Sequence, residues 1–358
     1  MTSSTKIARL LIVLLFLLFV FENGPVDFQE YKLMYGQIGA VNGRALTYEP
    51  LYVFLSKIAN SIGLSFEWYR AFVVIFELVL INNVIKRFTL NRALVLSLFL
   101  IFPACIDAEL FRQLFGMCVI LYGLQFLILA RDKKEYFKYL VCVIIASLFH
   151  SSCWVYLMFF LLCINNSKSI AIIVFIGLII GILTMSTDIW FKIFSYLPIR
   201  RFTLIKYDTG NYANTTGRIF AFVKQLFILS MAIIATSEMQ GKIAKNNVTT
   251  NAAIMLDQKI INLNIIAFLL LIPIFYSASA QRLIHVVVIY NYLALANCYD
   301  GRRSISYIIV VISVIYSAVL LLSLLFIEST GALDAFISHF YNGYLNNALE
   351  TLFHWLKI

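Results

Sequence analysis

The stretch "ELFRQLFG" (residues 109–116) stands between two long apolar runs, "ALVLSLFLIFPACI" (93–106) and "MCVILYGLQFLILA" (117–130). Neither run alternates between apolar and polar residues as a half-buried strand does, so both favour helices. A helix needs about 20 mostly apolar residues to cross a bilayer. The stretch therefore predicts a polar junction at one membrane face, with Arg112 and Gln113 between two membrane-spanning helices.

The whole chain shares this apolar character. Of its 358 residues, 62% are hydrophobic and 13% are charged, whereas soluble domains carry about 25% charged residues. In lipid the backbone must satisfy its own hydrogen bonds, and continuous apolar runs do so as helices. We expect an all-α integral membrane protein, a single polytopic domain over residues 1–358 with about 11 spanning helices. The expected spans are residues 7–21, 66–85, 93–106, 111–130, 136–149, 152–164, 170–185, 219–236, 260–276, 283–298 and 305–327.

The distribution of Lys and Arg predicts the orientation. With the N-terminus inside, the inner segments hold 15 of the 28 basic residues and 5 of the 18 acidic ones, while the outer segments hold 13 basic and 12 acidic residues. Short cytoplasmic loops are enriched in Lys and Arg, so the N-terminus is expected in the cytoplasm. Residues 22–65 and 186–217 are then outer segments, and 328–358 is an outer tail. This topology accounts for the net charge of +10, and nothing indicates a nucleic-acid partner.

The first outer segment contains a helical pattern. In "YEPLYVFLSKIANSIG" (48–63), Pro50 suits a helix start. Apolar residues then recur at helical spacing at Leu51, Phe54, Leu55, Ile58 and Ile62. This predicts an amphipathic helix at the outer membrane surface, and the tail 328–358 is expected to form another.

Polar residues from distant parts of the sequence fall at this same outer face. Arg112 opens one span, His150 closes another and Arg282 begins a later one. Glu77 is the one acidic residue well inside a span. The six cysteines lie in or beside apolar runs without a C-x-x-C pair, so neither a metal site nor a disulfide framework is predicted.

Four short motifs follow one another in a recognisable order: "YEP" (48–50), "LSFEW" (64–68), "RQ" (112–113) and "ASLFHSS" (146–152). Later in the chain only "QRLIHVVVIY" (281–290) adds to them. In these motifs and their spacing the chain resembles the EpsG-like branch of the Wzy-type polysaccharide polymerases. The resemblance is densest from Tyr48 to Leu162. Two apolar positions depart from the pattern, since Leu51 stands where many relatives carry Gly and Phe111 stands where Leu is usual.

The resemblance implies a multi-pass enzyme of the bacterial cytoplasmic membrane, related to the GT-C glycosyltransferases. Such polymerases join oligosaccharide repeat units carried on undecaprenyl pyrophosphate at the outer face. Because the polyprenyl pyrophosphate is the leaving group, no metal and no other cofactor is expected. The implied partners are these lipid-linked oligosaccharides, membrane lipids, and the chain-length regulator and flippase of the same pathway.

The polar residues fit that chemistry. Fixed arginines stabilise the charge that develops on a departing pyrophosphate, and their planar fork matches phosphate oxygens. The acceptor hydroxyl benefits from a base within hydrogen-bond reach, for which we rank Glu49 first and His150 second. The candidates for pyrophosphate binding are Arg112, Arg282, Arg200 and Arg201. The candidates for binding the glycan are Tyr48, Gln113 and Asp27. Two further candidates for the base are Asp27 and Glu109.

Other interpretations compete with this one. An arginine at a span end can simply reach the headgroups, and a histidine there can cap a helix. A flippase or transporter predicts several ionisable residues near the midplane and usually an internal repeat. A membrane acyltransferase would use a histidine at one face, as His150 is placed. The resemblance favours the polymerase.

The topology has a direct test. In a cysteine-free background, Lys133→Cys is expected to stay unlabelled by an impermeant maleimide in intact cells, because residues 131–138 form an inner loop rich in Lys and Arg. Lys57→Cys, in the outer segment, is expected to react. Labelling of position 133 from outside would overturn both the orientation and the outer-face site.

Overall fold

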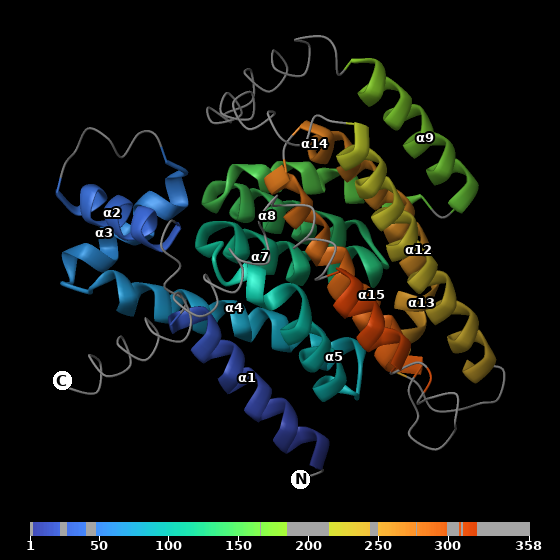
Figure 1. Ribbon diagram of the computed structural model, residues 1–358, viewed down its shortest axis with the longest axis horizontal. Helices are drawn as coiled ribbons and strands as arrows, with labels where there is room; N and C mark the ends of the chain where they lie inside the picture. The colour runs from blue at the N-terminus through green and yellow to red at the C-terminus, as the bar shows by residue number, and fades with distance from the viewer. Residues whose placement is uncertain are drawn as a thin grey trace.

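The computed structural model describes residues 3–21, 27–40, 48–164, 166–184, 215–243, 250–276, 278–298, 308 and 311–320. Within these residues every regular element is a helix (Figure 1), as predicted. The outer tail and most of the segment 186–217 lie outside the described residues, together with Arg200 and Arg201.

Described helices overlap all of the predicted spans. The elements are α1 (Ser3–Phe21), α2 (Asp27–Ala40), α3 (Pro50–Ser61), α4 (Phe66–Phe88), α5 (Arg92–Phe99), η2 (Leu100–Ala104), α6 (Cys105–Asp107), α7 (Phe111–Ile128), α8 (Lys133–Phe149), η3 (Ser151–Cys163), α9 (Ser167–Leu183), α12 (Thr215–Ile243), α13 (Asn251–Ala267), η5 (Phe268–Leu270), α14 (Leu271–Tyr276), η6 (Ala278–Ile284) and α15 (His285–Cys298), followed by an apolar helical stretch at Val311–Leu320.

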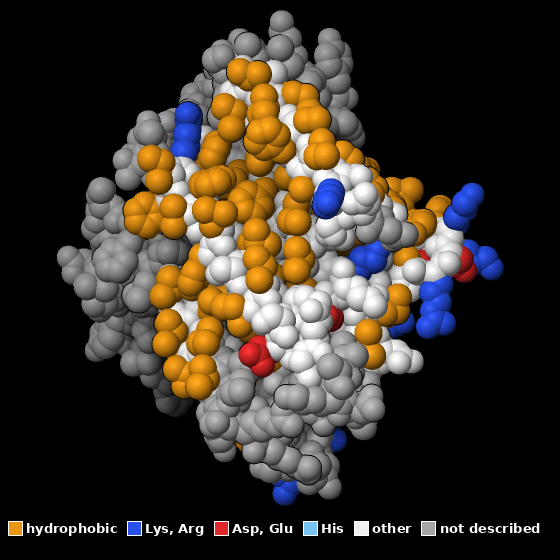
Figure 2. All heavy atoms as spheres, turned by 90° about the vertical axis from the view of Figure 1, so that its right-hand side faces the viewer, with side chains coloured by type: hydrophobic (Ala, Val, Ile, Leu, Met, Phe, Trp, Pro, Cys, Tyr) orange, Lys and Arg blue, Asp and Glu red, His pale blue; other side chains and the backbone are white. Residues whose placement is uncertain are grey.

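Four of the described helices are long and apolar enough to cross a membrane unaided: Ser4–Phe21, Phe111–Ile128, Arg218–Gly241 and Asn251–Phe275. Large apolar side chains of α9 and α12, such as Phe175 and Phe220, are exposed. Figure 2 shows hydrophobic side chains running along the face of the molecule that these helices form. Such a surface suits lipid rather than water, so the chain is a helical membrane protein, and the count of eleven spans stays a prediction.

The short predicted span at 152–164 is wound differently from its neighbours. The 13 residues of η3 form a 3-10 helix, which rises about 2.0 Å per residue and so extends about 26 Å. An α-helix of that length would extend only about 20 Å. The tighter winding lets a short segment cover most of a hydrocarbon core about 30 Å thick.

The predicted amphipathic helix is confirmed as α3, with Glu49 at its N-cap and Pro50 in its first turn. It buries Tyr52, Ser56 and Ala59 and leaves Phe54, Ile58 and Ile62 of the apolar stripe exposed. An outward apolar stripe is what a helix lying at a membrane surface presents to lipid.

Helix α2 was not predicted, because its sequence "DFQEYKLMYGQIGA" carries only a weak apolar stripe. It is placed by long-range hydrogen bonds. The Tyr35 hydroxyl donates to the Leu64 carbonyl at 2.7 Å, and Asn60 Nδ2 donates to the Tyr35 carbonyl at 3.2 Å. These bonds place α2 beside α3 and the start of α4.

Between α5 and α6 the chain is kinked at Phe102, whose backbone is extended at φ −157° and ψ 132°. Pro103 follows it and removes a backbone donor, so a regular α-helix cannot continue. At the kink the carbonyl of Phe102 accepts a hydrogen bond from the Tyr292 hydroxyl at 3.0 Å. The kink leads the chain into α6, which ends at Asp107.

Two glycines bring α7 close to its neighbours. A Cβ at Gly116 would lie 2.6 Å from Cys153 Sγ, and one at Gly123 would lie 2.7 Å from Cys142 Cβ. Small residues at such positions let membrane helices approach closely. Helix α7 is consequently the most enclosed of the long spans, with 89% of its residues buried.

The close approach at Gly116 gives a stability prediction. Gly116→Ala is expected to lower the free energy of unfolding by about 1–3 kcal/mol through overpacking against Cys153. Adding Cys153→Ala removes the Sγ atom, so the double variant should recover part of that loss. Gly36→Ala is the control, because nothing lies within 4 Å of its added Cβ. Thermal unfolding of the purified protein measures all three. A Gly116→Ala protein as stable as wild type would mean that α7 and η3 separate freely.

Candidate functional site

The carboxylate of Glu49 lies where three helices begin. Glu49 holds the N-cap position of α3, where its side chain makes no capping hydrogen bond. Its carboxylate instead contacts Arg112 in the first turn of α7 and accepts a hydrogen bond from Ser151 at the start of η3. Helix N-termini carry partial positive charge and backbone N–H groups without intrahelical partners. The start of η3 supplies one such N–H to the carboxylate, that of Ser151, and this favours an anion there.

The contacts of Glu49 are close and almost fully enclosed. One carboxylate oxygen, Oε2, lies 2.6 Å from Arg112 Nη1. The other, Oε1, accepts from the Ser151 backbone N–H at 3.3 Å and from the Ser151 hydroxyl at 3.2 Å. The side chains of Arg112 and Glu49 are only 8% and 10% exposed. We call Arg112, Ser151 and the carboxylate between them the cradle.

Three tyrosines surround the guanidinium of Arg112. The carbon at its centre lies 5.5 Å from the ring centre of Tyr31, 5.8 Å from that of Tyr48 and 5.3 Å from that of Tyr52. Cations are attracted to such ring faces, and the rings also exclude water. The rings come from α2, α3 and the residue before its N-cap, so the segment between α1 and α4 encloses the arginine.

The structure brings together four residues that the sequence selected separately: Glu49, Arg112, Tyr48 and His150. His150 ends α8, its Nδ1 lies 2.7 Å from the Ser152 hydroxyl, and it is close enough to Glu49 to interact with it electrostatically. Sequence reasoning missed Ser151 as a ligand of the carboxylate, although it lies inside the quoted motif "ASLFHSS".

The other candidates are placed as follows. Gln113 is buried in α7 beside Arg112. Asp27 is the first residue of α2, and its side chain is not among those described. Arg282 lies in η6, next to Gln281, where a second group of polar side chains is found. Among the described residues no cluster of His, Cys, Asp and Glu is arranged to hold a metal ion.

That second group was not predicted. His285 Nδ1 lies 2.7 Å from Asp107 Oδ1, with both side chains fully buried. Nearby, Arg70 donates to the Ala108 carbonyl at 2.9 Å, and Glu77 has Arg70 and Asp107 as charged neighbours. His285 stands inside "QRLIHVVVIY", where only the arginine had been singled out, and Asp107 lies just before the opening stretch.

Electrostatics keep Glu49 ionised. Burial by itself raises the pKa of the Glu49 carboxyl, but the Arg112 guanidinium, His150 and two backbone N–H groups act against it. The net result is a pKa below the ordinary value for glutamate. In this arrangement Glu49 is a carboxylate that occupies an anion site.

Fold and site together define a polytopic helical membrane protein with an arginine-containing anion cradle at one end of the bundle. The chain belongs to the EpsG family, whose model matches residues 6–345. It is thus a polymerase-type membrane protein of polysaccharide biosynthesis, which confirms the resemblance seen in the sequence. No curated protein and no solved structure matches the chain.

The lowered pKa of Glu49 makes a pH prediction. The ion pair stabilises the fold fully above the ordinary glutamate pKa of about 4.3, and this contribution is lost as the pH falls through the lower folded-state value. Glu49→Gln should therefore unfold at a lower temperature than wild type at pH 7, and the difference should shrink toward pH 3. Glu135→Gln is the control, because Glu135 pairs with Lys138 on the surface. If the difference between Glu49→Gln and wild type were the same at both pH values, the ion pair would not be the stabilising interaction.

Proposed function

We propose that the chain is a polysaccharide polymerase that joins oligosaccharide repeat units carried on undecaprenyl pyrophosphate, at the outer face of the bacterial cytoplasmic membrane. Family membership supports a polymerase. The observation that carries the donor chemistry is the cradle, since a buried arginine and the N–H and hydroxyl of Ser151 already hold a carboxylate there.

In this proposal the donor pyrophosphate exchanges with the Glu49 carboxylate. In the structure the carboxylate is held by Arg112 and by the N–H and hydroxyl of Ser151. When the donor binds, these groups form their hydrogen bonds to phosphate oxygens instead. Arg112 suits this role because its planar fork binds two phosphate oxygens at once. The three tyrosine rings keep water away, which strengthens the contacts that Arg112 makes.

The exchange also prepares the base. While paired with Arg112, Glu49 holds protons weakly, because its pKa is below the ordinary value. When Arg112 turns to the pyrophosphate, the carboxylate loses its partner and gains a neighbouring anion, and both changes raise its proton affinity. Glu49 then accepts the proton of the acceptor hydroxyl, so that the base becomes effective only when the donor is bound.

The reaction balances without a cofactor. The bond between the donor's anomeric carbon and the pyrophosphate oxygen breaks, and the acceptor oxygen forms the new glycosidic bond to that carbon. The hydroxyl proton goes to Glu49, and undecaprenyl pyrophosphate leaves with its electron pair. Arg112 stabilises the negative charge that develops on the leaving group.

The role of Arg112 is tested by a conservative substitution. Arg112→Lys keeps a cation beside Glu49 but lacks the planar fork, so polymerisation should fall by about 10²–10³. Cells that carry it should accumulate single repeat units on the carrier lipid. Arg87→Lys is the control, because Arg87 is another arginine whose Nη1 donates to a side chain, here Gln125 at 2.9 Å, but at an exposed position.

A charge swap separates pairing from catalysis. Glu49→Arg combined with Arg112→Glu restores an ion pair but exchanges the positions of the cation and the carboxylate. The double variant should recover stability relative to either single variant and still make no polymer. Full-length polymer at wild-type rates from Arg112→Lys, or from the charge swap, would reduce the cradle to a structural contact.

A further inference from the structure

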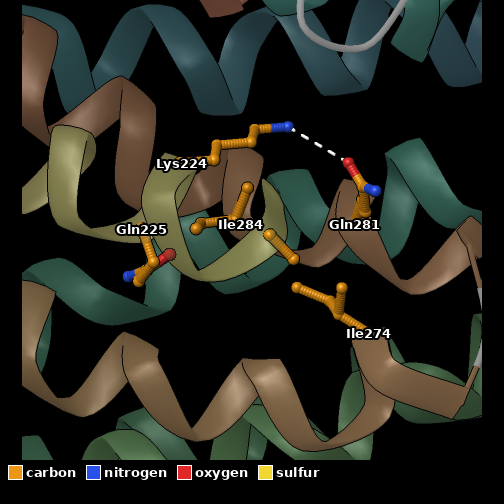
Figure 3. Close-up of a pocket in the computed structure, with 6 residues that line it drawn as sticks. Lys224, Gln225, Ile274, Gln281 and Ile284 are labelled. Carbon is orange, nitrogen blue, oxygen red and sulfur yellow. Dashed lines mark hydrogen bonds between the residues drawn. The ribbon is translucent and has the colours of Figure 1, made fainter. Parts of the chain in front are cut away.

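A small hollow lies between α12, α14 and η6, and the cradle does not use it. Ala221, Lys224, Gln225, Ile274, Gln281 and Ile284 line it (Figure 3). Lys224 Nζ donates to Gln281 Oε1 at 3.3 Å. Both side chains are almost completely buried, Lys224 being 8% and Gln281 2% exposed.

The hollow is lined by hydrogen-bond donors in otherwise apolar surroundings. The Nε2 group of Gln281 is buried and has no hydrogen-bond partner, which is rare for a buried donor. Beside it the Lys224 ammonium supplies a full positive charge. Arg282 follows Gln281 in η6, and its Nε is likewise buried without a partner. An amide donor next to a cation suits a phosphate oxygen.

Buried contacts hold this hollow in place. The Asp107–His285 pair ties the end of α6 to the start of α15, one helical turn beyond Gln281. Phe102 lies between the two groups, with its ring centre 5.1 Å from that of His285 and 5.8 Å from Lys224 Nζ. The position of the Gln281 amide is therefore set by α6, α12 and α15 together.

We propose that Lys224 and Gln281 form a second anion site, which holds the pyrophosphate of the acceptor lipid while the cradle holds that of the donor. This inference rests on the proposed function, because in that reaction both glycans are linked to lipid pyrophosphates. The acceptor reacts through the end of its glycan that is remote from its lipid. Its pyrophosphate therefore needs a separate binding site, apart from the cradle.

Binding stoichiometry tests the second site. The probes are farnesyl pyrophosphate and inorganic pyrophosphate, each titrated against the purified full-length chain in nanodiscs of zwitterionic lipid. Wild type should bind two farnesyl pyrophosphates, whereas Lys224→Met should bind one at wild-type affinity and the other at least about tenfold more weakly. Lys259→Met is the matched control, because Lys259 is another partly buried lysine, whose Nζ donates to the Leu162 carbonyl at 2.8 Å.

A second variant provides the test if Lys224→Met folds poorly. Gln281→Leu removes only the amide and should weaken the same one of the two sites. Farnesyl pyrophosphate should bind the second site more tightly than inorganic pyrophosphate, because the acceptor's anion is carried by a lipid. Equal binding of the two probes would assign the hollow to a free anion and overturn the acceptor role. Two unchanged sites in both variants would overturn the proposal altogether.

The two proposals fail in different ways. If Arg112→Lys polymerises normally while Lys224→Met still loses one site, the donor assignment is wrong and the second site stands. If Lys224→Met binds both probes like wild type while Arg112→Lys makes no polymer, the polymerase proposal stands and the second site is rejected.

Discussion

The ion pair between Glu49 and Arg112 is the contact on which the arrangement of the segment between α1 and α4 depends. Each of these charges is about nine-tenths buried, and an isolated charge in such a place costs several kcal/mol in lost hydration. Arg112 also stands in the first turn of α7, where the helix dipole disfavours a cation. The carboxylate offsets both penalties, and its second oxygen satisfies the start of η3. Three helices that are distant in sequence are joined by one side chain.

Behind that contact, the bundle is braced by hydrogen bonds that lipid cannot supply. Asn264 Nδ2 donates to Asn291 Oδ1 at 2.8 Å, and Asn291 Nδ2 donates to the Ile228 carbonyl at 3.1 Å, which links α12, α13 and α15. The Tyr156 hydroxyl of η3 donates to the Leu283 carbonyl at 2.8 Å. Side-chain bonds and close packing at small residues are the main attractions between helices in a membrane. They hold in place the helices that carry both proposed anion sites.

The two sites differ in a way that suits two roles. The cradle holds its own carboxylate, so a ligand must displace an anion that is then free to accept a proton. The hollow presents an ammonium and an amide instead. A leaving group whose departure must be coupled to proton transfer fits the first arrangement. A lipid headgroup that must be bound without reacting fits the second arrangement.

Composition alone determined that this chain is a helical membrane protein, because long apolar runs in lipid have no alternative to helices. The starts of α4 at Phe66 and of α7 at Phe111, and the proline start of α3, were also readable, since those signals are local in sequence. The motifs selected Glu49, Arg112 and His150 as polar residues at one face. Helix α2 escaped prediction because its side chains have only a weak apolar stripe and its place depends on contacts with α3 and α4.

Only the tertiary structure decided how the polar residues combine. Glu49 and Arg112 are 63 residues apart, and no local pattern could tell that the proposed base and the proposed phosphate ligand are partners. Asp107, Lys224 and His285 were passed over because each is embedded among apolar neighbours and reads as part of a span. Which side chains these residues contact depends on how the helices pack against one another. That packing is set by the kink at Phe102, the glycines of α7 and the buried hydrogen bonds, and not by any single stretch of sequence.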